Sequence, residues 1–246
     1  MVSAVHSDPR SNGLLACLAP DDFALLSPQL KRVTLDEGMV LQEPEAPIER
    51  VCFPLNGMIS LLVVMREGQT IEIATVGSEG AVGTCAALGH RRAFTRAVVQ
   101  VPGLAWSVSA SLLQRALAQS ERMRDVVLRY RDSLMAQVLQ TAACNALHPI
   151  EGRLARRLLQ TADRIPADLL PLTQDMLAQI LGVRRTTVTA VAQKLQADGL
   201  IRYRRGRIEI ADRRGLEAQA CECYEAIAHW TAMAAETEPA AIREPA

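Results

Sequence analysis

The stretch that decides the fold runs over residues 172–197 and reads LTQDMLAQILGVRRTTVTAVAQKLQA. Thr173 suits the N-cap of a short helix over 174–181, because its hydroxyl can accept a backbone N–H that the first helical turn leaves free. Gly182 supplies the permissive conformation that a tight turn requires. A longer helix then starts near Arg184 or Arg185 and runs to the end of the stretch.

The apolar residues of these two helices recur at helical spacing, so they can face one another across the turn. They are Leu177, Ile180, Val188, Val191 and Leu195, with the small Ala178 where the helices cross. A short helix, a glycine turn and a longer helix form a helix-turn-helix, whose second helix typically lies in the major groove of DNA.

The first turn of the second helix is rich in cations and hydroxyls. An arginine at this position can bond guanine O6 and N7 together, while threonine hydroxyls suit phosphates or base edges. The candidate DNA contacts in this motif are Thr173, Arg184, Arg185, Thr186, Thr187, Thr189 and Lys194.

The next segment, GLIRYRRGRIEI over residues 199–210, reads as two short strands joined by a tight basic turn. Such a β-hairpin, or wing, carries cations onto the sugar-phosphate backbone. Its candidate DNA contacts are Arg204, Arg205 and Arg207.

Charge is distributed unevenly along a chain whose formal net charge is zero. Residues 184–214 carry 9 Lys or Arg against 3 Asp or Glu, whereas residues 215–246 carry 1 against 6. A concentrated basic block in a neutral chain favours a nucleic-acid partner over a uniformly solvated surface.

The N-terminal part has a different texture, which predicts a β-roll of the jelly-roll kind over residues 14–109. Short apolar runs such as MISLLVVM and TIEIATV alternate with glycines and prolines, as in small all-β domains. Residues 66–69, Arg-Glu-Gly-Gln, look like a hairpin turn between two strands.

Residues 110–147 lack glycine and proline and predict one long helix. An apolar stripe on it could pack on either domain, and we favour pairing with the same helix of a second subunit. The predicted dimer interface is Met123, Val127, Tyr130, Leu134 and Val138. A winged helix-turn-helix domain over 149–215 and a C-terminal helix over 216–234 complete an α+β fold.

Composition excludes several classes of protein. The chain has 246 residues, 49% of them hydrophobic, which is too apolar for disorder. It lacks a run long enough to span a membrane and a secretory leader, so we expect a cytoplasmic location. It also lacks the motifs of hydrolases, P-loop proteins and dinucleotide enzymes, so we expect no enzyme.

The six cysteines are scattered and lack CxxC spacing, so we expect free thiols and no metal or other cofactor. Cys221 and Cys223 are two positions apart, and a helix there would turn them to different faces.

These motifs resemble the Crp/Fnr family of transcription regulators over nearly the whole chain. FPLNGMISLL and ATVGSEGAVG resemble that family's cyclic-nucleotide-binding-type β-roll, and residues 173–210 resemble its winged helix-turn-helix. The resemblance implies a homodimer, an inverted-repeat site on double-stranded DNA and contact with RNA polymerase. Thr186 and Ala190 stand where family members often carry Glu and Arg, so the preferred half-site can differ.

The resemblance also implies where a small-molecule effector would bind, and there the sequence departs from the family. Ala81 stands where a ribose-binding Glu is expected, and Arg96 is displaced by about one residue from the phosphate position. An unknown effector could instead use Glu79, Gly80 and Arg96, and we expect cyclic AMP to bind poorly. The alternative function is a ligand-binding regulatory module that acts through protein partners without DNA.

Overall fold

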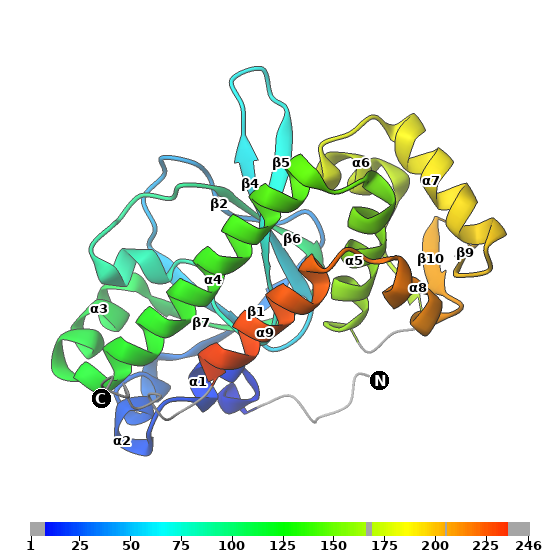
Figure 1. Ribbon diagram of the computed structural model, residues 1–246. Coiled ribbons are helices and arrows are strands. Elements are labelled where there is room, and N and C mark those ends of the chain that lie inside the picture. The colour runs from blue at the N-terminus through cyan, green and yellow to red at the C-terminus, as the bar shows by residue number, and fades with distance from the viewer. Residues whose placement is uncertain (1–7, 166–168, 205, 236–246) are drawn as a thin grey trace, which may run out of the picture.

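The computed structural model describes residues 8–165, 169–204 and 206–235 (Figure 1). The N-terminal part contains α1 (Gly13–Ala16), α2 (Pro20–Ala24), β1 (Lys31–Leu35), β2 (Val40–Gln42), β3 (Arg50–Pro54), β4 (Met58–Val64), β5 (Thr70–Val76), the 3-10 turn η4 (Thr84–Leu88), β6 (Arg96–Val101) and β7 (Gly103–Ser109). The remainder contains α3 (Ala110–Gln119), α4 (Glu121–Leu147), α5 (Ile150–Ala162), β8 (Leu169–Leu170), α6 (Gln174–Leu181), α7 (Arg185–Ala197), β9 (Ile201–Arg204), β10 (Arg207–Ile210), α8 (Arg213–Gln219) and α9 (Cys223–Ala235).

The strands of the N-terminal part form two antiparallel sheets, ordered β1-β7-β3 and β2-β6-β4-β5. Alternate residues of both sheets point into one shared core, as Leu35 and Ala105 do from the first sheet and Ile59 and Val99 from the second. The predicted β-roll is therefore confirmed.

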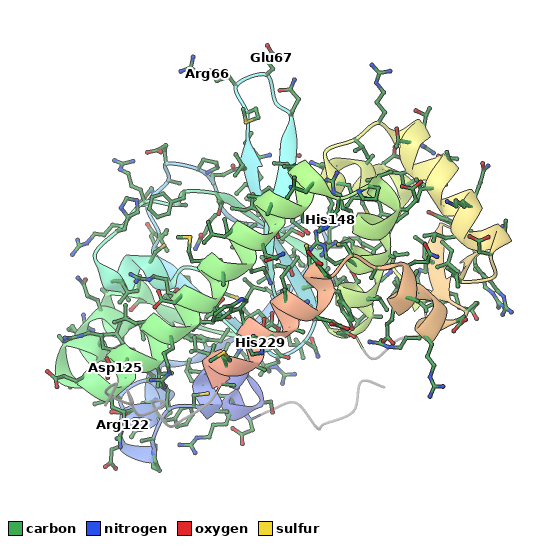
Figure 2. The ribbon with its side chains drawn as sticks, in the orientation of Figure 1. Arg66, Glu67, Arg122, Asp125, His148 and His229 are labelled. Atoms are coloured by element: carbon green, nitrogen blue, oxygen red, sulfur yellow. The ribbon has the colours of Figure 1, made fainter. Side chains whose placement is uncertain are left out.

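The turn predicted over residues 66–69 joins β4 to β5. The backbone N–H of Met65 donates to the carbonyl oxygen of Gln69 at 2.8 Å, and Gly68 takes the positive φ of +87° that the turn needs. The hairpin projects beyond the rest of the roll, with Arg66 and Glu67 at its tip (Figures 1 and 2).

Residues 110–147 form two helices rather than the single helix that the sequence predicts. Ser120 has extended backbone angles, ends α3 and caps α4 by accepting the N–H of Met123 at 3.0 Å. A serine side chain that bonds the backbone competes with helix continuation, which explains the break. The first helix packs on β3, β7 and η4, so it covers the β-roll.

The stripe predicted to form the dimer interface instead packs on the chain's own β-roll. Met123, Val127 and Tyr130 are at most 6% exposed within one chain, and Leu134 and Val138 pack partly buried against the same cores. Met123, Val127 and Tyr130 therefore belong to the chain's own core rather than to a dimer interface, whereas for Leu134 and Val138 the interface stays a prediction. An apolar stripe in the sequence indicates that one face of a helix is buried, but not which surface buries it. Here the chain's own β-roll buries that face.

The C-terminal part has its own core around α5, α6, α7 and the three-stranded sheet β8-β10-β9. The first strand of that sheet, β8, has only two residues, which are too few to show a periodicity in the sequence. Leu154, Leu158, Leu177 and Val188 are fully buried in this core.

The C-terminal helix predicted over 216–234 is also interrupted. A segment of three residues, Ala220 to Glu222, separates α8 from α9, which packs along α4 (Figure 1). Because of this break, Cys221 and Cys223 do not lie on one continuous helix. They approach Cys144 and His148 at the end of α4, so the two thiols lie in one cluster rather than on different faces of a helix.

Two ion pairs fasten α5 and its C-terminal end to the β-roll. Arg157 forms an ion pair with Glu72 of β5 at 3.0 Å, with both side chains buried, and Arg164 donates to Glu79 at 2.8 Å. Apolar contact continues across the same junction, because Met58 and Val101 of the β-roll belong to the core of the C-terminal part. Among the described residues, no helix is both long and apolar enough to cross a membrane.

Candidate nucleic-acid interface

The helix-turn-helix forms where the sequence predicts it. Thr173 accepts the N–H of Met176 at 3.2 Å and starts α6. Gly182 ends α6 in the left-handed conformation at φ +64°. The turn at Gly182 leads into α7. Leu177 of α6 and Val188 of α7 are buried in the same core.

The first turn of α7 presents its polar side chains outward. Arg184, Arg185 and Thr186 are exposed, while Thr187 and Thr189 are half-buried. This turn carries no side-chain cap, so the free backbone N–H groups at its start remain available to an anion.

Two polar contacts join α6 to α7 beneath this surface. Arg185 Nη1 pairs with Asp175 at 2.8 Å, and the Thr189 hydroxyl donates to Gln174 Oε1 at 2.7 Å. The Arg185–Asp175 pair is about two-thirds exposed on both sides, so solvent screens it and little free energy holds it closed. The guanidinium can therefore exchange Asp175 for another acceptor.

The wing is the β9–β10 hairpin, closed by Gly206 at φ +79°. Arg204 forms an ion pair with Glu209 at 2.8 Å and Arg207 is exposed, whereas Arg205 lies outside the described residues. Lys194, near the end of α7, is exposed as well.

Sequence reasoning missed Arg202, a cation on the same strand as Arg204. It is 61% exposed and lies 3.7 Å from Glu209. Alternation along β9 could have identified it, because residues two apart on a strand share a face and Ile201 marks the buried face.

The candidate effector residues are not brought together as one pocket. Glu79 pairs with Arg164, while Arg96 pairs with Glu43 at 2.8 Å on the surface. The Tyr130 ring fills the space above Gly80, where the Cβ of any larger residue would overlap the ring. Tyr130 also donates its hydroxyl to the carbonyl of Ala81 at 2.8 Å.

The Glu79–Arg164 pair also shapes the protonation of Glu79. Burial on its own raises the pKa of the Glu79 carboxyl, but the Arg164 guanidinium and the N–H of Gly77 outweigh burial and lower that pKa below its usual range. Glu79 is thus an anion committed to its partner, and Arg164 is a contact that sequence reasoning missed because 85 residues separate the two.

The fold and this surface define a β-roll protein with a C-terminal winged helix-turn-helix. Residues 152–219 match the family model described as a Crp-like helix-turn-helix domain. These residues therefore form a Crp-like helix-turn-helix domain, and the chain as a whole is similar to transcriptional regulators of the Crp/Fnr type.

Curated relatives span most of the chain. The chain is 26% identical over 185 residues to the global nitrogen regulator of Synechococcus elongatus, covering 71% of this chain and 83% of the relative. It is 28% identical over 200 residues to the transcriptional regulator SdrP of Thermus thermophilus, and the match covers 75% of this chain and 92% of SdrP. These relatives are named as regulators and not as enzymes, in agreement with the prediction from the sequence.

Solved structures share the fold. FixK2 from Bradyrhizobium japonicum superposes with a TM-score of 0.68 at 14% identity, covering 78% of this chain and 98% of that one. A putative Crp/Fnr-family regulator from Eubacterium rectale gives 0.67 at 17% identity, covering 84% and 96%. At these identities the likeness establishes the fold.

Proposed function

We propose that the protein is a sequence-specific DNA-binding transcription regulator that binds an inverted-repeat operator as a homodimer. The observation that carries the proposal is the outward-facing first turn of α7. Arg184, Arg185 and Thr186 extend there from an uncapped helix N-terminus, beside a wing of arginines.

Arg185 is the proposed base-reading residue. Its partner in the free protein, Asp175, accepts two bonds from one guanidinium nitrogen, at 2.8 and 3.0 Å. The O6 and N7 atoms of guanine offer two acceptors to two different N–H groups of the guanidinium. DNA would therefore replace one exposed ion pair with a bidentate contact, at little cost for breaking the pair.

The wing and Lys194 supply the sequence-independent part of the affinity. Arg202, Arg204 and Arg207 are exposed on β9 and β10, and contacts of this kind with phosphates fix the register of a protein on the duplex. Each neutralised phosphate releases counterions, so affinity should fall steeply with salt.

Dimerisation is proposed through a different face of α4 from the one that the sequence indicated. Met135 and Leu139 are 55% and 63% exposed, and Ala142 and Ala146 continue the same face at spacings of three and four residues. Such spacing matches the seam of a two-helix coiled coil. A second copy of α4 is the proposed occupant, since a closed twofold pair places two α7 helices on two half-sites.

The location in the cytoplasm, contact with RNA polymerase and an unidentified effector also belong to this proposal. They rest on the likeness to transcriptional regulators. The pairing of Glu79 with Arg164 and the Tyr130 ring above Gly80 both argue against a cyclic nucleotide seated on Glu79 and Arg96.

Fluorescence anisotropy on labelled genomic fragments tests DNA binding by the full chain. We expect a subset of fragments to retain the protein against excess random-sequence competitor, with affinity that falls as salt rises. Equal competition by every fragment would contradict sequence-specific binding. No binding at low salt would favour the alternative of a module that acts without DNA.

A further inference from the structure

Four potential metal ligands from two distant segments meet at the junction of α4, α5 and α9. Cys144 and His148 come from the end of α4, and Cys221 and Cys223 from the α8–α9 connection. Their ligand atoms all lie within 4.8 Å of one another. The Sγ atoms of Cys144 and Cys221 are 3.5 Å apart, and Cys223 Sγ is 3.3 Å from His148 Nδ1.

We propose that these four residues form a Cys₃His site for one zinc ion, which ties the C-terminal helix to the end of α4. Three thiols and one imidazole are a donor set typical of structural zinc. With zinc–sulfur bonds of about 2.3 Å, the corners of a tetrahedron lie about 3.8 Å apart, close to the spacing seen here. Small side-chain adjustments would complete the coordination.

The same spacing distinguishes one ion from an iron–sulfur cluster. The four ligands of a cluster bind different irons that sulfide bridges hold apart, so they spread more widely than the ligands of a single ion. Here all four atoms fall within the compact limit of 4.8 Å. The geometry therefore points to a mononuclear site.

The backbone holds the ligands in this arrangement without metal. Cys144 and His148 are one helical turn apart on α4, and the His148 N–H donates to the Cys144 carbonyl at 3.1 Å. Cys221 N–H donates to the Gly152 carbonyl at 3.3 Å, and a Cβ at Gly152 would come within 3.4 Å of Cys221 Cβ. Because Gly152 lacks a side chain, the α8–α9 connection can lie close to the start of α5.

The surroundings have the features of an outer ligand shell. His148 turns Nδ1 towards the thiols, and its Nε2 lies 3.8 Å from Glu222 Oε1, beyond hydrogen-bond distance. A small movement of the exposed Glu222 side chain would complete the carboxylate–histidine–metal arrangement that fixes the ring and its tautomer in metal sites. Gln140 Nε2 donates to Cys223 Sγ at 3.1 Å. Figure 2 shows His148 where α4 meets the C-terminal part.

Charge balance supports the same assignment. One Zn²⁺ with three thiolates and a neutral imidazole carries a net charge of −1, after the three thiol protons pass to solvent. Arg153 and Arg156 lie on α5 in the turn that begins at Gly152, whose carbonyl accepts the Cys221 N–H. Both side chains are buried, and the Nε atom of each is without a hydrogen-bond partner in the described residues. A partly buried anionic site would give these cations a counterpart.

The test uses the full chain purified under reducing conditions. We expect about one zinc per chain by elemental analysis, as four protein ligands saturate a structural site. After removal of zinc, titration with Co²⁺ should give the visible d–d bands of tetrahedral cobalt and a thiolate-to-cobalt charge-transfer band. Cys223→Ser and His148→Ala should weaken Co²⁺ binding by at least about tenfold, and Glu222→Ala should weaken it by about 10–100-fold.

Cys85→Ser is the matched control, because Cys85 lies in η4 outside the cluster, and it should bind Co²⁺ as the unaltered chain does. Circular dichroism of each variant separates loss of metal from loss of fold. The proposal is overturned if the reduced chain gives no tetrahedral cobalt spectrum, or if Cys223→Ser binds Co²⁺ as tightly as Cys85→Ser. Iron with labile sulfide, or a Cys144–Cys221 disulfide that persists under reduction, would also overturn it.

Discussion

At the residue scale, the proposed recognition of DNA depends on an arginine that the free protein already orients. Arg185 stands at the start of α7 and is anchored to Asp175 by an exposed pair of bonds. Because an exposed pair contributes little free energy, the side chain is oriented without being trapped. Thr186 and Thr187 beside it offer hydroxyls that suit phosphates or several bases and therefore discriminate little between sequences. Because an arginine bonds guanine at two atoms, Arg185 is expected to carry most of the discrimination.

Arg185→Ala should weaken binding to the preferred site by about 1–3 kcal/mol and flatten discrimination at one position in each half-site. Competition anisotropy with single-base variants of the site measures both effects. Arg207→Ala is the control, since loss of a phosphate contact should weaken all sequences alike and reduce the salt slope by about 1. A uniform loss for Arg185→Ala would mean that it contacts phosphate.

Cyclic AMP and cyclic GMP should not bind measurably at physiological concentration. Ala81 has no side-chain acceptor for a ribose hydroxyl, and the carboxylate of Glu79 is already paired with Arg164. A buried phosphate without a cation would be strongly disfavoured. Isothermal calorimetry checks this, and a micromolar isotherm with either nucleotide would contradict the proposed loss of the family's ribose and phosphate contacts.

At the element scale, the sequence predicts some elements closely and others incompletely, for physical reasons. The bounds of α6 and the start of α7 follow from the Thr173 cap and Gly182, which are local signals. The break between α3 and α4 depends on one serine hydroxyl. A serine within a helix-forming run can either continue the helix or cap a new one, so the sequence alone does not predict the break. The metal-ligand cluster could not be predicted because 77 residues separate Cys144 from Cys221.

The face of α4 proposed to form the dimer seam could not be predicted from the sequence either. Periodicity finds an apolar stripe but not the surface that covers it, so it indicates a dimer seam at Tyr130 although that residue belongs to the core. The exposed residues Met135 and Leu139 are recognisable only once the buried face is known.

Leu139→Glu should therefore weaken the homodimer, because it places a charge in the proposed seam, where an unpaired buried charge is costly. Sedimentation velocity over a range of concentrations should show the dissociation constant rising at least about tenfold, equivalent to about 1.4 kcal/mol. Met65→Glu changes an equally exposed apolar residue at the β4–β5 turn and should leave the assembly unchanged. An unaltered dimer for Leu139→Glu would reject this seam.

At the scale of the whole molecule, the two parts are joined by buried contacts rather than by a free linker. Arg157 with Glu72, Arg164 with Glu79 and the apolar contact around Met58 lie at one junction. Removing one member of a buried pair leaves an uncompensated charge, so this junction should resist separation. The orientation of α7 relative to the β-roll thus depends on these pairs.

Acid should weaken the junction through Glu79. The pKa of its carboxyl is lowered in the folded chain, so its contribution is fully present above the unfolded value near 4.5 and is lost as pH falls through the lower folded value. Glu79→Gln should cost about 1–3 kcal/mol at neutral pH and remove this part of the acid dependence.

Urea unfolding of the wild type and of Glu79→Gln, at neutral pH and below pH 4.5, measures the difference. The exposed carboxylate Glu37 provides the control Glu37→Gln, which should follow the wild-type acid profile. If Glu79→Gln loses stability in acid as steeply as the wild type, the Arg164 contact does not carry the effect.

Selection of binding sites from random duplex DNA by the full chain tests the central claim most directly. We expect enrichment of an inverted repeat whose half-sites lie about one helical turn apart, with a guanine in each half that Arg185→Ala no longer selects. Enrichment of no sequence, or of a motif that the Arg185→Ala variant selects equally well, would contradict it.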